Sequence, residues 1–184
     1  MSRDLIVTEN ITLDGVIDAS EGWFGVADGD RADMSAVEKA HRDGADAVLF
    51  GRVTFEQMAG YWPHRENDTT GVTDYLNTTQ KYVVSRTLTD PAWQNSTVLR
   101  GDLTDEVMKL KEADGKAIVA TGSIRLVREL GRRDLVDEYR LFVHPVVLGR
   151  GERLFADATG MPELALAEAV PFRSGVVLLR YRRS

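Results

Sequence analysis

The chain has 184 residues, no cysteine and a net charge of -6 at pH 7. This length is most simply one domain with a substantial core, so we expect a single domain over residues 1–184. The acidic balance argues against a general nucleic-acid binder, and the lack of cysteine excludes disulfides, thiolate nucleophiles and cysteine metal sites. No leader precedes the first strand-like run and no apolar run is long enough for a bilayer, which predicts a cytoplasmic protein without a membrane partner.

Short apolar runs that end in glycine or polar residues predict the strands of an α/β sheet. These runs are Leu5–Thr8, Ala47–Phe50, Lys81–Val84, Thr97–Leu99 and Lys116–Ala120. Helix-like segments separate most of them, which is typical of parallel strands with crossover connections. Three further runs, at 136–143, 164–170 and 176–181, follow without a long helix between them. We therefore expect an antiparallel edge at the C-terminal end of the sheet.

Local signals predict where several helices begin and end. Ser35 and Glu38 match a capping box, so a helix should begin at Ser35. A helix should follow Gly51 and end at Gly60, because glycine is the usual residue just after a helix. Ser123 stands where an N-cap residue would stand for a later helix.

The turn after the buried run Ala47–Phe50 predicts an anion site. Gly51 breaks the run, and Arg52 and Thr54 follow it with helical spacing. The free backbone N–H groups at the start of a helix, together with its dipole, favour an anion. The alternative is an ordinary strand–turn–helix joint with a surface arginine.

Four predicted strands end in small or polar residues. The four ends are Gly51-Arg52, Ser85-Arg86, Arg100-Gly101 and Thr121-Gly122-Ser123. Ligands of parallel sheets bind beyond the carboxyl ends of the strands, and arginine makes bidentate contacts with phosphate. Three arginines at these ends suit a dinucleotide, and two at neighbouring ends suit an extra 2′-phosphate, which favours NADPH over NADH. Each arginine taken singly can also be a solvated loop charge.

Other familiar sites are not indicated. No Gly-x-Gly-x-x-Gly turn and no Walker-type loop occurs. The three histidines, His41, His64 and His144, lack the spacing of metal ligands, so we expect no metal. The loop from Asp18 to Asp33 carries two aromatic residues, which is typical either of a functional loop or of a cover over one end of the core.

The motifs resemble, in order, the reductase family formed by dihydrofolate reductases and the C-terminal domain of bacterial bifunctional riboflavin deaminase-reductases. The segments that carry the resemblance are Ile11–Gly15, Phe50–Glu56, Val83–Arg86, Val119–Ser123, Leu135–Leu141 and Pro145–Phe155. Each motif is weak alone, but the ordered set covers nearly the whole chain. The resemblance implies a dihydrofolate reductase-like α/β fold of three layers, with a mixed, mostly parallel sheet of about eight strands and an antiparallel C-terminal edge.

The resemblance also implies NADPH as the hydride donor. By analogy, the pyrophosphate meets Gly51, Arg52 and Thr54, while the adenosine ribose and 2′-phosphate meet Ser85, Arg86 and Arg100. The diphosphate and nicotinamide side lies near Thr121, Gly122, Ser123 and Ile124. Thr121-Gly122 stands where the family has a Gly-Gly pair.

The same resemblance implies a heteroaromatic substrate. A loop with Leu13, Asp14, Trp23 and Phe24 would close over the reacting ring, and Met34, Phe55, Met58 and Trp62 would wall the pocket. Dihydrofolate reductases carry an acid on the first helix, at a place that falls near Ser35 here, and Asp33 is close to it. The proton is expected from water, from Asp14 or from Asp33.

We therefore expect a stand-alone NADPH-dependent reductase of a pteridine- or pyrimidine-like heterocycle, such as dihydrofolate or the ribosylaminouracil of riboflavin synthesis. The alternative is a non-catalytic NADP(H)- or nucleotide-binding protein of the same fold. A third interpretation is a structural subunit whose arginines are merely solvated. The apolar C-terminal strands leave room for a homodimer, as the reductase domains of this family often form.

Overall fold

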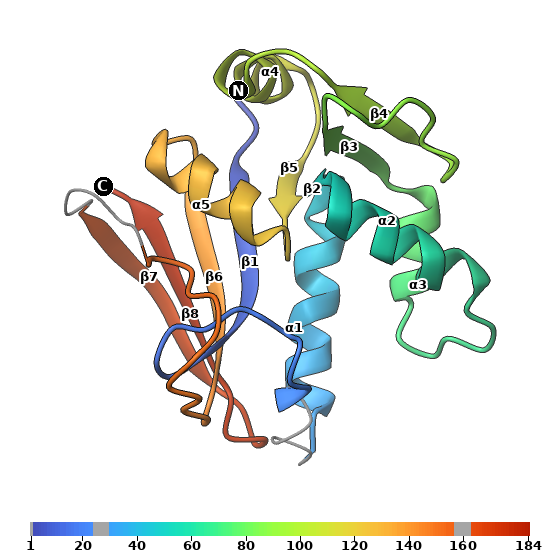
Figure 1. Cartoon of the computed structure of the whole chain (residues 1–184). Coiled ribbons are helices and arrows are strands. Elements are labelled where there is room, and N and C mark those ends of the chain that lie inside the picture. Colours follow the sequence, from blue (N-terminus) through green and yellow to red (C-terminus); the bar gives the residue numbers. More distant parts are fainter. Residues whose placement is uncertain (1, 24–29, 157–162) are drawn as a thin grey trace.

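The protein is organised around one eight-stranded sheet with the strand order β4-β3-β2-β5-β1-β6-β8-β7 (Figure 1). The computed structural model describes residues 2–23, 30–156 and 163–184. The strands are β1 (Leu5–Thr12), β2 (Ala45–Gly51), β3 (Gln80–Val84), β4 (Ser96–Leu99), β5 (Ala117–Ala120), β6 (Glu138–His144), β7 (Leu164–Pro171) and β8 (Val177–Arg183). The helices are α1 (Ala32–Asp43), α2 (Arg52–Tyr61), the 3₁₀ turn η2 (Trp62–His64), α3 (Val72–Thr78), α4 (Leu103–Glu112) and α5 (Ile124–Arg132).

The sheet is parallel from β4 to β6 and antiparallel at its other edge. β1 pairs in parallel with β5 and β6, β2 with β3 and β5, and β3 with β4. β8 pairs antiparallel with both β6 and β7. The predicted fold class, including the antiparallel C-terminal edge, is confirmed.

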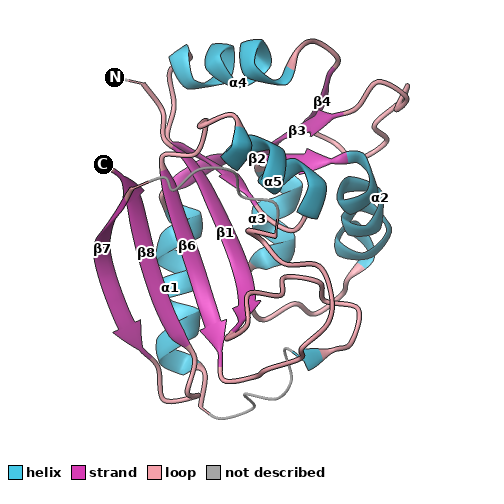
Figure 2. Cartoon of the chain, turned by 60° about the vertical axis from the view of Figure 1, so that its left-hand side comes forward, coloured by secondary structure: helices cyan, strands magenta, loops and turns pink. Residues whose placement is uncertain are grey.

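Helices cover both faces of the sheet, and Figure 2 shows α1 and α5 on opposite faces. On the α5 face, Leu5 and Val7 of β1 join Val107 of α4 and Leu130 of α5 in one apolar cluster. These residues explain why the strand runs are apolar almost throughout: a strand that is covered on both faces has no solvent side.

The opposite face carries two smaller clusters. Met34 of α1 packs with Phe142 and Leu178 over the antiparallel part of the sheet. Phe55 of α2 and Leu76 of α3 belong to a separate cluster over β2 and β3. The helices on this face therefore form two groups, α1 on one side and α2 with α3 on the other, and strands β1 and β5 lie between the groups.

The start of α1 differs from the prediction. The helix begins at Ala32, and Ser35 lies inside it, so the capping box is wrong. The Oδ1 atom of Asp30 accepts from the Ala32 N–H at 3.0 Å, and the Oδ1 atom of Asp33 accepts from the Met34 N–H at 2.8 Å. Because these carboxylates already satisfy first-turn N–H groups, the helix starts before the serine.

Gly60 does not end α2. The helix continues through Tyr61 into η2, and the Trp62 N–H still donates to the Met58 carbonyl. Gly60 is absent from the residues with positive φ. Glycine closes a helix when it takes the left-handed conformation, and here it stays helical, so this prediction is wrong.

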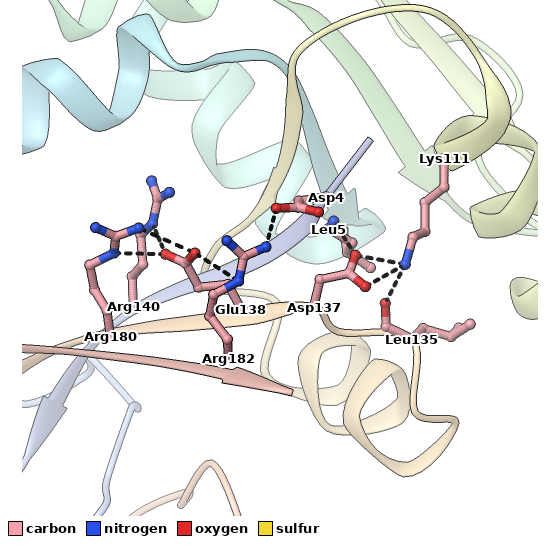
Figure 3. A network of polar contacts seen from close by, with 9 residues as sticks. All are labelled: Asp4, Leu5, Lys111, Leu135, Asp137, Glu138, Arg140, Arg180 and Arg182. Atoms are coloured by element: carbon pink, nitrogen blue, oxygen red, sulfur yellow. Dashed lines mark hydrogen bonds and ion pairs between the residues drawn. The ribbon is translucent and has the colours of Figure 1, made fainter. Parts of the chain in front are cut away.

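A polar network joins the two halves of the sheet (Figure 3). The carboxylate of Glu138, which is 1% exposed, accepts from Arg140 Nε at 2.6 Å and from Arg180 Nε at 2.8 Å. Arg182 lies 3.9 Å from the same carboxylate and pairs with Asp4 at 2.6 Å. The network thus links β6, β8 and the residue before β1.

Candidate functional site

A cavity of 470 Å³ lies on the α1 face of the sheet, and its size is that of a small-molecule site. It occupies the space between the two helix groups of that face. The strands contribute Thr8, Asn10, Val48, Phe50, Val119, Thr121 and Phe142 to its wall, and the helices and η2 contribute Arg31, Glu38, His41, Arg42, Met58, Trp62, Val72, Tyr75 and Leu76.

The polar part of the cavity wall comes largely from α1. Burial raises the pKa of Glu38 above its usual value. Burial, with the nearby charges of Arg140 and Arg180, lowers the pKa of His41 to about 4, so its ring is neutral at pH 7. The buried His41 Nδ1 has no hydrogen-bond partner among the residues described. The wall thus offers a carboxyl and an imidazole beside two arginines, Arg31 and Arg42, and a set of apolar side chains.

The sequence analysis missed these α1 residues as functional candidates. Glu38 and His41 stand four and seven positions after Met34, so they share a helix face with a buried core residue. A carboxyl on the core-facing side of an amphipathic helix was the available signal. It was hidden by the capping-box interpretation of the same glutamate.

The carboxyl ends of β2 and β5 are joined by two hydrogen bonds. The Gly51 N–H donates to Ser123 Oγ at 2.9 Å, and the Ser123 N–H donates to Thr54 Oγ1 at 2.9 Å. The Ser123 hydroxyl therefore faces α2. The prediction that Ser123 caps its own helix is wrong, because α5 has no side-chain N-cap hydrogen bond. Gly122 has a φ of +59°, and a Cβ there would lie 3.1 Å from Thr54 Cγ2. Both the conformation and the close approach favour glycine at this joint.

The joint places the N-termini of α2 and α5 next to each other. Neither helix has a side-chain N-cap hydrogen bond, so backbone N–H groups of both first turns remain available. Two helix dipoles then favour an anion at the same place. Thr121, which lines the cavity, directly precedes the joint, and Ile124 is the first residue of α5.

The predicted arginines lie at neighbouring strand ends, because β4, β3, β2 and β5 are adjacent in the sheet. Arg52 is exposed and pairs with Glu56 at 3.1 Å. Arg86 and Arg100 are exposed, and neither forms an ion pair with a residue that the structure describes. The Ser85 hydroxyl accepts from two backbone N–H groups of the turn that follows, at 3.2 and 3.0 Å, so it holds that turn.

Two of the predicted substrate residues line the cavity and two others do not. Met58 and Trp62 are wall residues. Met34 lies in the core under α1, and Phe55 packs against Trp93 with 5.9 Å between ring centroids. Both of the latter are too deeply packed to face the cavity.

Leu13 and Trp23 of the predicted loop lie outside the cavity wall. Leu13 is 64% exposed, and Trp23 is buried with its Nε1 donating to the Asp18 carbonyl at 2.7 Å. Trp23 meets the ring of His144 edge-on at 5.2 Å. Phe24 falls outside the described residues.

The predicted acids Asp14 and Asp33 also lie outside the cavity wall. Asp14 accepts from the Thr12 hydroxyl at 2.7 Å and from the Gly149 N–H at 2.8 Å, and these bonds lower its pKa to about 2. Asp33 Oδ2 accepts from the Arg173 N–H at 3.0 Å. Both carboxylates hold loops in place, and neither is set up to deliver a proton to the cavity.

The described residues form neither a metal site nor a membrane-spanning helix. No group of three or more histidine, aspartate or glutamate side chains among them can hold a metal ion. No helix in the described part of the chain is long and apolar enough to cross a membrane.

Comparisons with known proteins agree with this architecture. The RibD C-terminal domain family matches residues 3–178. The Bacillus subtilis (strain 168) protein YyaP is 33% identical over 184 residues, covering 97% of this chain and 94% of YyaP. A putative riboflavin biosynthesis protein from Shewanella sp. PV-4 superposes with a TM-score of 0.79 at 19% identity, over 100% of this chain and 99% of that one.

A bifunctional protein from Thermotoga maritima has a similar fold. It is described as a diaminohydroxyphosphoribosylaminopyrimidine deaminase/5-amino-6-(5-phosphoribosylamino)uracil reductase. It superposes with a TM-score of 0.67 at 18% identity, over 100% of this chain and 57% of that protein. Because the RibD C-terminal domain family matches residues 3–178, which is nearly the whole chain, this protein belongs to that family.

Proposed function

We propose that the protein is an NADPH-dependent reductase of a pteridine- or pyrimidine-like heterocycle. One observation carries the proposal: the cavity reaches Thr121, and the joint that brings the N-termini of α2 and α5 together begins at the next residue, Gly122. An anion-binding joint and a small-molecule cavity thus share one strand end. This is the arrangement that a dinucleotide and a ring substrate need in order to meet.

The residues at the strand ends fit the parts of NADPH. The N–H groups at the starts of α2 and α5 suit its diphosphate, and Gly122 lets Thr54 of α2 pack closely against the strand end that leads to α5. Arg86 and Arg100 are exposed cations at adjacent strand ends and suit the 2′-phosphate. When bound, the cofactor would supply the hydride, and the walls from Val48 and Phe50 would exclude water from the cavity.

Glu38 is the proposed source of the proton, in place of Asp14 or Asp33. It is the carboxyl that lines the cavity, and burial raises its pKa, so its neutral form persists to higher pH than that of an exposed glutamate. A neutral carboxyl can donate its proton to a ring nitrogen next to the carbon that accepts the hydride. Reduction of a C=N bond would then use one hydride from the cofactor and one proton from Glu38.

The first substrates to test follow from the relatives. The Thermotoga maritima protein is described as a 5-amino-6-(5-phosphoribosylamino)uracil reductase. That compound and simple pterins are the candidates for this cavity. Such a reaction draws on the NADPH of the cytoplasm, so the proposal includes a cytoplasmic location.

Fluorescence titration of the three tryptophans with NADPH and, separately, with NADH tests the cofactor assignment. We expect NADPH to bind about tenfold or more tightly than NADH, since charge-assisted hydrogen bonds are the strong ones. Arg86→Ala and Arg100→Ala should each remove most of that preference and leave NADH binding unchanged. Arg183→Ala, at the other end of the sheet, removes the same charge and should leave both affinities unchanged. Equal binding of the two cofactors, or binding of neither, would contradict the assignment.

A non-catalytic NADP(H)-binding protein is the second candidate. The engagement of Asp14 and Asp33 in loop contacts favours it, because those two acids are not available for chemistry. It predicts NADPH binding without NADPH oxidation in the presence of any pterin or aminouracil. NADPH oxidation that is lost when Glu38 is replaced would favour the reductase over the non-catalytic binding protein.

A further inference from the structure

A polar pair lies in the wall of the cavity and just behind it. Asn10 lines the cavity from β1, and its Oδ1 atom lies 2.9 Å from Nε2 of His144. His144 is the last residue of β6 and pairs in register with Thr12 of β1, so it is a close neighbour of Asn10 on the same face. His144 is 1% exposed, so this contact is made away from water.

The protonation of His144 follows from its surroundings. Burial, together with the charge of Arg31, lowers the pKa of His144, and the ring is neutral at pH 7. A neutral imidazole carries one N–H, and an amide oxygen can only accept. The ring nitrogen that faces Asn10 Oδ1 is therefore the one that carries the proton. Trp23, which packs edge-on at 5.2 Å, braces the ring from another side.

The engaged oxygen fixes the other end of the amide. With Oδ1 of Asn10 turned toward His144, Nδ2 points away from it. Nδ2 of Asn10 donates to no residue that the structure describes. It is also not among the buried polar atoms that lack a hydrogen-bond partner. An amide nitrogen of a cavity-lining residue in this state is a donor offered to whatever fills the cavity.

The other polar strand residues of the cavity wall, Thr8 and Thr121, do not distinguish a donor from an acceptor on a ligand. The hydroxyls of Thr8 and Thr121 can each donate or accept, so they adapt to either kind of ligand atom. An Asn amide held at its oxygen cannot adapt without breaking its bond to His144. Asn10 is therefore the strand position at which a donor and an acceptor on a ligand ring are told apart.

We propose that His144 is a positioning residue that holds the Asn10 amide with its N–H donors toward the cavity, so that the site selects a heterocycle with a carbonyl oxygen at that point. The inference rests on the proposed function, because it takes the cavity as the substrate site. His144 does not touch the substrate in this arrangement, and its effect passes through Asn10.

NMR of histidine-labelled protein tests the holding contact without any ligand. We expect the His144 ring to be neutral at pH 7 with its proton on Nε2. In Asn10→Asp, the carboxylate should raise the pKa of His144 and favour the doubly protonated ring. A wild-type ring with Nε2 unprotonated would mean that the amide is turned the other way, which would overturn the proposal.

Binding of two matched pteridines tests the selection. Pterin presents a carbonyl oxygen on its ring edge, and its diamino analogue carries an amino group in that place. Wild type should bind pterin about tenfold more tightly, because two facing donors leave one buried donor unsatisfied. Asn10→Asp should reverse the preference, since its carboxylate accepts from the amino group.

Substitutions of His144 separate positioning from packing. His144→Phe keeps a ring against Trp23 but has no donor, so the preference for pterin should fall to near unity. His144→Gln supplies an N–H donor and should restore part of it. Equal preference in wild type and in both variants would overturn the proposal. Wild-type protein that has the Nε2 proton but binds neither pteridine would support the held amide and count against the proposed reductase function.

Discussion

Single residues on α1 give the cavity its chemical character. On a solvated helix, Glu38 would be ionised and His41 would titrate near neutral pH. Facing the sheet, the carboxyl has a raised pKa and the imidazole a lowered one, and burial is the largest cause of both changes. Both groups are thus shifted toward their neutral forms, which suits the binding of an uncharged ring.

Glu38→Gln tests the proposed acid. We expect turnover to fall by about a hundredfold or more, the usual contribution of general acid catalysis, while NADPH affinity stays unchanged. Catalysis needs the protonated carboxyl, so wild-type activity should decline as pH rises through the raised pKa of Glu38. The variant should lack that decline. Rates of NADPH oxidation across a pH series, with a pterin or aminouracil acceptor, measure both effects.

Glu112→Gln serves as the matched control, because this glutamate is exposed at the end of α4, away from the cavity wall. It should leave the rate and the pH profile unchanged. If Glu38→Gln kept full turnover, water would be the proton source and the role of Glu38 would be limited to shaping the cavity.

The residues at the strand ends were predicted from the sequence, whereas Glu38 and His41 on α1 were missed although their spacing from Met34 was an available signal. Gly51, Gly122 and Ser123 stand directly after apolar runs, so the sheet topology alone brings them to one edge. Asn10 and His144 come into contact only through the parallel pairing of β1 with β6, which sequence patterns do not specify. Asn10 and His144 both lie just beyond the predicted strand runs Leu5–Thr8 and 136–143, and His144 was considered only as a possible metal ligand.

At the scale of elements, the strands were predicted better than the helix ends. An apolar run has few ways to be buried, so each run became a strand within a few residues of its predicted bounds. Helix ends depend on which side chain reaches the free N–H groups first. Asp30 and Asp33 do so before Ser35 can, whereas α4 is capped by Asp102, which directly precedes it and accepts from the Thr104 N–H at 2.8 Å.

The contact between β6 and β8 depends on a charged group that is almost fully buried. Burial alone would raise the pKa of Glu138, but hydrogen bonds from Arg180 and Arg140 lower it overall. Arg180 also pairs with Glu168 at 2.8 Å, whereas Arg140 has its ion pair with Glu138 alone among the described residues. Loss of the Glu138 charge would therefore leave Arg140 partly buried and without its counter-ion (Figure 3).

Glu138→Gln should lower the free energy of unfolding by about 3 kcal/mol at neutral pH, the lower end of the cost of breaking a buried ion pair. Because the folded-state pKa of Glu138 is lowered, its contribution is present above the unfolded value of 4.5 and is lost as pH falls through the folded value. The stability of the variant should depend less on pH in that acidic range. Urea unfolding over a pH series measures both changes.

An exposed glutamate with a similar set of partners provides the comparison. Glu129 of α5 pairs with Arg132 at 2.8 Å and with Arg133 at 2.8 Å. Because solvent screens this cluster, Glu129→Gln should cost less than about 1 kcal/mol. Equal losses in the two variants would mean that the burial of Glu138 adds nothing to the junction between β6 and β8.

At the scale of the whole molecule, the two halves of the sheet have different surroundings. The parallel half is covered on both faces, and the cavity lies where α1 and the α2–α3 group leave space between them. The antiparallel half ends in β7, most of whose residues are exposed. Sequence composition could indicate an apolar C-terminal edge, but only the strand order shows that β7 is the outermost strand.

The edge of β7 is the proposed place for a homodimer. Seven of its eight residues are uncharged, and Leu166 is 56% exposed. Edge strands of monomers are usually protected by charges, bulges or covering segments. β7 has one charge, Glu168, and a register shift between Leu166 and Glu168, but most of its residues are apolar and exposed, which favours pairing with a second copy. We expect a dimer by light scattering over a concentration series.

Leu166→Lys should give a monomer with unchanged unfolding, because two like charges would face each other across the paired edges. Met108→Lys, at an exposed apolar position on α4, should remain dimeric. A wild-type monomer at all concentrations would contradict the prediction, and a dimer that persists in Leu166→Lys would move the interface away from β7.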